Sequence, residues 1–199
     1  MLVDSNFYKL SCNYTNQVIT KLRGSQMKGK LSRRISFLGI SIALVYVATS
    51  ISVPMPKPLG VWHIGDIASF VVAIFFGPFI GALACGIGAM LFDIWNPLWG
   101  SSFIIWAPAT LIIRGIMGFL LGKMRRIIPN KPRLSEILAM VIASIQKNVC
   151  YFLYDYTLFG TVAFLDLVTF FPLSALDIIV SVPLISSIRK ILRVEYIFS

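Results

Sequence analysis

Six mostly apolar stretches follow one another along the chain, separated by short polar or proline-containing segments. They cover about residues 35–53, 64–79, 80–95, 103–121, 137–154 and 162–188. None alternates between apolar and polar residues and each exceeds the length of an ordinary strand, which argues against a β-barrel. A helix needs about 20 apolar residues to cross a bilayer. The pattern therefore predicts an all-α integral membrane protein, a bundle of six transmembrane helices.

Prolines and glycines predict where these helices end or bend. Three prolines between residues 54 and 58 stop the first helix and stiffen the loop after it. Gly77 and Pro78 predict a break between the second and third helices. Both helices are short for a full crossing, so we expect a tight hairpin of thin or tilted helices. Pro172 and Pro183 predict bends in the sixth helix.

The composition agrees with a membrane protein and excludes other classes. Hydrophobic residues make up 57% of the 199 residues and charged residues 13%, against about 45–50% and 25% in soluble domains. A soluble enzyme, a disordered chain and a collagen-like chain are excluded. The three cysteines, Cys12, Cys85 and Cys150, have neither metal-ligand spacing nor an even number, which excludes a disulfide scaffold.

The basic residues orient the bundle. Six alternating crossings place fifteen of the 18 lysines and arginines on one side. These are Lys9, Lys21, Arg23, Lys28, Lys30, Arg33, Arg34, Lys123, Arg125, Arg126, Lys131, Arg133, Arg189, Lys190 and Arg193. The positive-inside rule then predicts a multi-pass protein of the cell membrane with both termini in the cytoplasm. The lipid bilayer explains the net charge of +10 without a nucleic-acid partner.

The domain organisation follows from the same pattern. We expect a basic, disordered cytoplasmic tail over residues 1–34, the membrane domain over 35–193 and a short tail over 194–199. Met27 precedes the basic run that leads into the first helix. Whether residues 1–26 belong to the native protein therefore stays open.

Aromatic and acidic side chains gather at the predicted outer ends of the helices. They are Trp62, Trp95, Trp99 and Trp106, with His63, Asp66, Asp93, Asn96 and Asp155. An aromatic belt at the lipid headgroups is one interpretation, but a belt occurs at both membrane faces. The alternative is a cavity that takes a flat polar ligand from outside.

Ionisable side chains inside the membrane need partners or a function, since each costs about 2.5–3.5 kcal/mol on insertion scales. Lys147 and Asp177 lie deep in the fifth and sixth helices, so we expect them to form an ion pair. Whether that pair is structural or contacts a ligand stays open. We expect Arg114 to snorkel to the cytoplasmic surface and Asp166 to lie near the outer surface.

The sequence lacks the motifs of common catalytic sites. It has no phosphate-binding G-x-x-x-x-G-K-[ST] motif, no H-E-x-x-H and no G-x-S-x-G. We therefore predict no catalytic residue, no metal site and no cofactor. His63, the one histidine, is expected to be solvated in a loop.

Several segments of the second to fourth predicted helices carry a resemblance to a known family. They are residues 64–70 (IGDIASF), 76–82 (FGPFIGA), 86–93 (GIGAMLFD), 107–110 (APAT) and 114–118 (RGIMG). The pattern resembles the substrate-binding S components of energy-coupling factor (ECF) vitamin transporters, especially the riboflavin-type group. The resemblance extends over about residues 35–193.

The resemblance implies a function and assigns residues to it. S components capture a vitamin or precursor from outside and dock to a transmembrane coupling protein driven by two ATPase subunits. In that family small residues on the first helix face the coupling protein, which implies docking by Gly39 and Ala43. The ligand is held by helices four to six under a loop that serves as a lid. The expected contacts here are Trp62 (in the lid), Trp106, Lys147, Asn148, Tyr151, Ser174 and Asp177.

The chain departs from the riboflavin pattern in the sixth helix. Riboflavin carriers follow a proline there with Asn and then Lys, whereas Pro172 is followed by Ser174 and Asp177. A carboxylate in place of a cation favours a donor-rich or positively charged ligand, such as a pyrimidine, pyridoxine-like or thiamine-like molecule. The identity of the vitamin and whether the coupling module is shared stay open. Two alternatives remain: a membrane structural or assembly protein without a small ligand, and a solitary secondary transporter.

Overall fold

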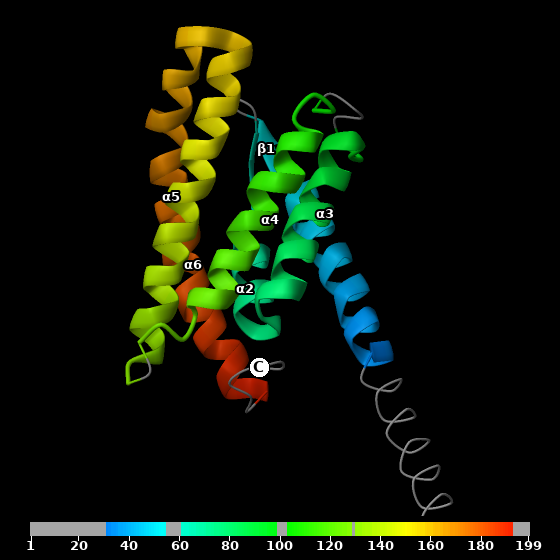
Figure 1. Cartoon of the computed structure of the whole chain (residues 1–199), viewed down its shortest axis with the longest axis vertical. Helices are drawn as coiled ribbons and strands as arrows, with labels where there is room; N and C mark the ends of the chain where they lie inside the picture. The colour runs from blue at the N-terminus through cyan, green and yellow to red at the C-terminus, as the bar shows by residue number, and fades with distance from the viewer. Residues whose placement is uncertain (1–30, 55–60, 99–102, 129, 193–199) are drawn as a thin grey trace, which may run out of the picture. The chain divides into compact units, whose positions relative to one another are not determined.

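The computed structural model describes residues 31–54, 61–98, 103–128 and 130–192, which are mostly helical (Figure 1). A first helix covers Leu31–Ser50. After it come β1 (Ser52–Pro54), β2 (Val61–His63), α2 (Gly65–Phe76), α3 (Pro78–Ile94), α4 (Ala107–Met124), α5 (Pro132–Phe159), the 3₁₀ helix η1 (Gly160–Ala163) and α6 (Phe164–Leu192).

The chain divides into two units between Phe37 and Leu38, and the strands and the helices from α2 onwards belong to the second. Of the predicted tails, residues 1–30 and 194–199 lie outside the described residues, and residues 31–34 are helical. Residues 55–60 of the predicted lid also lie outside them.

Three helical stretches among the described residues are long and apolar enough to cross a bilayer. They are Leu31–Ser50, Ala107–Met124 and Pro132–Ile191, the last of which includes both α5 and most of α6. The helices α2 and α3 have 12 and 17 residues, or about 18 and 26 Å at 1.5 Å per residue, against a hydrocarbon core of about 30 Å. The prediction that these two helices are short is confirmed.

The break between α2 and α3 lies at Gly77, as the sequence predicts. Gly77 has a φ of 87°, in the region that only glycine enters readily. Pro78 is the first residue of α3, where its fixed φ and missing N–H suit a helix start. Arg125 at the end of α4 donates from Nη1 to the carbonyl oxygen of Ile74 at 2.5 Å. This bond satisfies a carbonyl at the C-terminus of α2 that has no partner within its own helix.

Small residues bring α3 and α4 together along much of their length (Figure 1). A Cβ added at Gly81 would lie 2.9 Å from the carbonyl oxygen of Gly118, and one added at Gly86 would lie 2.8 Å from that of Leu111. Close backbone approach of this kind is how helices associate in lipid. The glycines of α3 and α4 therefore permit this close packing.

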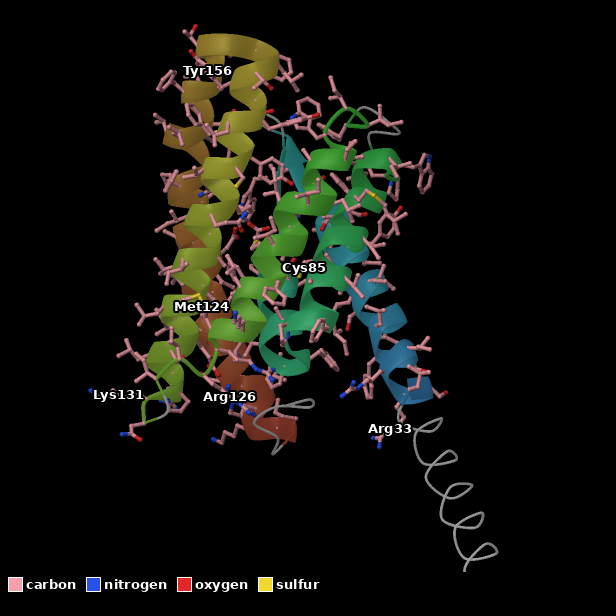
Figure 2. All side chains as sticks on the ribbon, viewed as in Figure 1. Arg33, Cys85, Met124, Arg126, Lys131 and Tyr156 are labelled. Atoms are coloured by element: carbon pink, nitrogen blue, oxygen red, sulfur yellow. The ribbon has the colours of Figure 1, made fainter. Side chains whose placement is uncertain are left out.

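The largest group of buried apolar side chains lies among α2 to α6. Cys85, near the middle of α3, belongs to it (Figure 2). The group comprises Phe70, Ala73, Ile74, Phe75, Cys85, Met117, Leu121, Ala139, Met140, Ala143 and Ile185. It fills the half of these helices away from the polar side chains described below.

Apart from Arg114 and Lys147, the basic residues of α4, α5 and α6 lie at one end of these helices. Arg126 and Lys131 lie at this end, and Tyr156 lies at the opposite end (Figure 2). Arg189 donates from Nη2 to Glu136 Oε1 at 2.5 Å, which joins the last turn of α6 to the start of α5.

Several element boundaries differ from the predicted ones, most clearly those of the first helix and of α5. The first helix ends at Ser50 rather than near residue 53, because Ser52–Pro54 pairs with Val61–His63 in an antiparallel hairpin. The helix α5 covers 28 residues and extends beyond residues 137–154 at both ends. Those extra turns are polar, so hydropathy alone does not detect them. The helix α6 continues through Pro172 and Pro183.

Candidate functional site

A cavity of about 180 Å³ lies between β2 and the helices α2 to α6, towards the end opposite Arg126 and Lys131 (Figure 2). Polar and aromatic side chains line it. They are His63, Asp66, Phe92, Asp93, Phe103, Trp106, Thr110, Arg114, Lys147, Asn148, Tyr151, Asp155, Phe159, Val162, Ala163, Asp166 and Phe170. Its volume is close to the roughly 150 Å³ of an apolar protein cavity that binds benzene, so a single aromatic ring fits.

Four of the seven predicted ligand contacts line this cavity: Trp106, Lys147, Asn148 and Tyr151. Ser174 lies directly behind two of them, with its hydroxyl oxygen 3.3 Å from Lys147 Nζ and 3.1 Å from Asn148 Nδ2. Asp177 and Trp62 do not line the cavity. Asp177 is 3% exposed.

An ion cluster forms one wall of the cavity. Asp66, in the first turn of α2, pairs through Oδ1 with Arg114 and through Oδ2 with Lys147. The three side chains come from α2, α4 and α5 and are almost completely buried. One carboxylate therefore neutralises cations from two other helices.

This cluster corrects two predictions. Lys147 pairs with Asp66 rather than with Asp177, because Asp66 in the first turn of α2 reaches residues of both α4 and α5. Arg114 does not snorkel: it is 2% exposed and is held by the same carboxylate. Asp177 still lies near enough to attract both cations.

The aromatic side chains of the cavity form a continuous row. The ring centroids of Phe92 and Phe103 are 6.0 Å apart at 14°, and those of Phe103 and Trp106 are 6.0 Å apart. Trp106 continues to Phe159, with centroids 5.9 Å apart at 30°. Trp106 Nε1 donates to Asp155 Oδ1 at 2.6 Å. Phe103 and Trp106 are tilted by 54°, so the row offers several aromatic faces on which a planar ligand can stack.

Several buried polar atoms around the cavity have no hydrogen-bond partner. They are Trp62 Nε1, His63 Nδ1, Asp93 Oδ2, Arg114 Nε and Asp177 Oδ1. Trp62 lies beside Asp177, although no hydrogen bond joins these two atoms in this geometry. Buried polar groups are nearly always paired in proteins, so these atoms mark where a ligand or water completes the structure.

His63 lines the cavity, so the prediction that it is solvated is wrong. The strand β2 carries it inward, where its ring packs edge-on against Phe92. Burial, followed by the charges of Arg114 and Lys147, holds the pKa of His63 well below its ordinary value. It is therefore uncharged at neutral pH and presents a neutral ring to the cavity.

Sequence reasoning missed several lining residues as candidate contacts, above all Asp66, Asp93 and Asp155. The available signal was their position: all three are carboxylates at the predicted outer ends of helices. Among the described residues, no group of three or more histidines, cysteines or carboxylates is arranged to hold a metal ion.

The first helix presents an open face away from the cavity. Gly39 and Ala43 are exposed on it, and a Cβ added at Gly39 would meet nothing within 4 Å. The opposite face packs Val45 against α3, where a Cβ added at Gly88 would lie 2.9 Å from the Val45 Cβ. The predicted docking residues are thus available on the surface.

Comparison with known proteins gives a family. The sequence profile of the family described as "ECF-type riboflavin transporter, S component" matches residues 30–190. A Pyrococcus woesei protein described as "Uncharacterized protein in gap 3'region" is 30% identical over 118 residues, 59% of this chain and 74% of the relative. A solved structure described as "Structure and mechanism of the S component of a bacterial ECF transporter" aligns with 82% of this chain and 94% of its own, at 18% identity and a TM-score of 0.49. Since the profile covers far more than half of the chain, the protein belongs to the family of S components of ECF-type riboflavin transporters.

Proposed function

We propose that this protein is the binding subunit of an ECF-type importer, which captures a vitamin or vitamin precursor from outside the cell. The observation that carries this proposal is the cavity lined by Asn148, Tyr151 and the Asp66 ion cluster. A purely structural membrane protein is expected to fill such a space with side chains. An unfilled cavity with unpaired polar atoms around it favours a ligand site.

In this proposal all six helices cross the bilayer and both termini are cytoplasmic. The basic end of α4, α5 and α6 then lies inside, following the positive-inside rule, and the end with the cavity faces outside. A ligand reaches the cavity past the β1–β2 hairpin, which serves as part of the lid.

Delivery requires a partner in this proposal. The protein carries no ATP-binding motif, so the free energy of ATP hydrolysis enters through a coupling protein and two ATPase subunits. The exposed face around Gly39 and Ala43 is the proposed docking surface, because small residues permit close approach of another helix. The protein itself binds and releases its ligand unchanged and catalyses no reaction.

Ligand-dependent stabilisation tests the binding role. The purified protein in detergent is heated with and without riboflavin, thiamine, pyridoxine or pyridoxamine. A ligand at about 100 times its Kd stabilises the folded state by about 2.7 kcal/mol, so one vitamin at micromolar concentration is expected to raise the melting midpoint. The Asn148→Leu variant keeps the branching and the number of heavy atoms but removes a polar contact, and is expected to lose most of this rise.

Gln146→Met is the matched control, since Gln146 lies on the same helix but does not line the cavity. This variant is expected to keep the full ligand response. The proposal is wrong if no vitamin shifts the midpoint and the protein never co-purifies with coupling and ATPase subunits. Uptake by cells that lack these subunits would instead support a solitary secondary transporter.

A further inference from the structure

The charged side chains around the cavity form two groups that differ in net charge. The inner group contains Arg114 and Lys147, both of which pair with Asp66 and have Asp177 nearby. Its two cations and two carboxylates balance. The outer group contains Asp93, Asp155 and Asp166, which line the cavity. None of these three has a lysine or arginine within 4 Å among the residues that the structure describes.

Asp93 is the strongest sign that a ligand neutralises the outer group. It lies in the last turn of α3, is 9% exposed and lines the cavity. The Thr110 hydroxyl lies near its carboxylate and accepts a hydrogen bond from the Tyr151 hydroxyl at 2.9 Å. The other oxygen, Oδ2, is buried without any partner. A buried carboxylate is unfavourable unless a cation or a set of donors completes it.

Asp155 and Asp166, at the junction of α5 and α6, are likewise carboxylates that lack a compensating positive charge within the described part of the chain. Their carboxyl groups lie near enough to influence each other, and Trp106 Nε1 donates a hydrogen bond to Asp155. Two adjacent carboxylates repel unless they share a proton or a cation. Both side chains are only partly buried, so an incoming ligand reaches them before it reaches the inner group.

The aromatic row lies between these carboxylates. Phe92, Phe103, Trp106 and Phe159 lie in sequence along the cavity, with Asp93 adjoining Phe92 and Asp155 bonded to Trp106. Aromatic faces attract cations, and more strongly when water is excluded. Carboxylates beside aromatic rings therefore select a ligand that is both flat and positive.

We propose that the ligand is a heteroaromatic cation with a single ring, such as a pyridine or pyrimidine that bears a protonated amine. Its ring lies against the aromatic row and its positive nitrogen binds the outer carboxylates. The cavity of about 180 Å³ has room for one ring, whereas a three-ring ligand requires the walls to move. This inference rests on the proposed function, because it takes the occupant of the cavity to be the transported molecule.

Calorimetric titration with a matched pair of ligands tests the charge. Pyridoxamine and pyridoxine share one pyridine ring and differ in a protonated aminomethyl group against a hydroxymethyl group. We expect the purified protein to bind pyridoxamine about tenfold or more tightly than pyridoxine, since a charge-assisted bond is stronger than a neutral one. Riboflavin, an uncharged three-ring ligand, is expected to bind more weakly than pyridoxamine.

Asp93→Asn connects this preference to the carboxylate, because it removes the charge and keeps the shape. It is expected to weaken pyridoxamine binding about tenfold and to change pyridoxine binding less than about threefold. Glu136→Gln removes a carboxylate at the basic end of the helices and is expected to change neither. The melting midpoints of both variants without ligand show whether they fold.

Two measurements separate the failure of this inference from the failure of the proposed function. Tight binding of riboflavin or pyridoxine that depends on Asn148, with no preference for the cation, overturns the inference and leaves the binding role intact. Mass spectrometry of the small molecule released from protein purified from its host is expected to identify a single-ring cation, and a neutral or acidic molecule overturns the inference. If neither measurement detects a bound ligand, both the inference and the proposed function are overturned.

Discussion

At the scale of residues, Asp66 is the side chain on which the cavity depends. It holds Arg114 and Lys147, and all three are nearly completely buried. Asp66→Asn leaves two buried cations without their directly paired carboxylate, and Asp177 alone remains nearby. Loss of one partner from a buried pair costs about 3–5 kcal/mol, so we expect a clear fall in the melting midpoint of the purified protein.

Asp166→Asn is the matched control for this substitution. It changes the same chemical group at a partly buried position without an ion pair among the described residues. Its midpoint without ligand is expected to stay close to that of the unchanged protein. Equal midpoints for Asp66→Asn and the unchanged protein would contradict the role given to the cluster.

The ion cluster shows that the sequence predicts the need for an ion pair but not the identity of the partner. The cost of burying Lys147 is visible from its place in an apolar stretch, and it predicts that a carboxylate partner exists. Its partner is 81 positions away, and hydropathy gives no information on which helix comes nearest. Asp177 satisfies the same argument from sequence, and only the positions of the side chains in the structure show that Lys147 pairs with Asp66.

At the scale of elements, the contact between α3 and α4 depends on glycines. A Cβ at Gly118 would overlap the carbonyl group of Gly81 and lie 3.0 Å from Cys85 Sγ. Gly118→Ala is therefore expected to separate the two helices and destabilise the protein by about 1–3 kcal/mol, as overpacking does. The melting midpoint measures this loss.

Gly115→Ala offers a control one turn away on the same helix. Its added Cβ would lie 3.7 Å from the carbonyl oxygen of Ala82, an ordinary contact. This variant is expected to match the unchanged protein or exceed it slightly, since alanine favours a helix over glycine. A larger loss at position 115 than at position 118 would contradict the proposed packing.

The apolar stretches and the helix-breaking residues predicted where most of these helices lie. Where a helix ends in polar residues, hydropathy predicted its boundary poorly. The break at Gly77 and Pro78 can be predicted because it depends only on the backbone preferences of these two residues. The length of α5 cannot, because its ends carry residues such as Arg133 and Asp155 that lie beyond the apolar stretch. The pairing of β1 with β2 was also missed, since three-residue strands beside prolines give no periodic signal.

At the scale of the whole molecule, binding and docking are expected to be separable. The face around Gly39 lies on the first helix, and the cavity is lined by later elements. Gly39→Trp places a large side chain on the proposed docking surface without touching the cavity. We expect this variant to keep ligand-dependent stabilisation and to co-purify with less coupling protein when the two are expressed together.

Val168→Trp controls for the addition of a bulky exposed side chain. Val168 is 74% exposed on α6 and does not line the cavity. This variant is expected to co-purify as the unchanged protein does. If both tryptophan variants lose the partner equally, or neither does, the surface around Gly39 is not the docking site.

The short connection between the hairpin and α2 links the entrance of the protein to its interior. Only Ile64 and Gly65 separate β2 from Asp66, and Gly65 is pressed against the Thr49 side chain, so the backbone has little freedom to hinge there. A hairpin that swings outward must therefore pull on the carboxylate that holds α4 and α5. Under the proposed function, outward movement of the hairpin would thus be coupled to loosening of the ion cluster, and a ligand that holds the cluster together would also favour the closed hairpin.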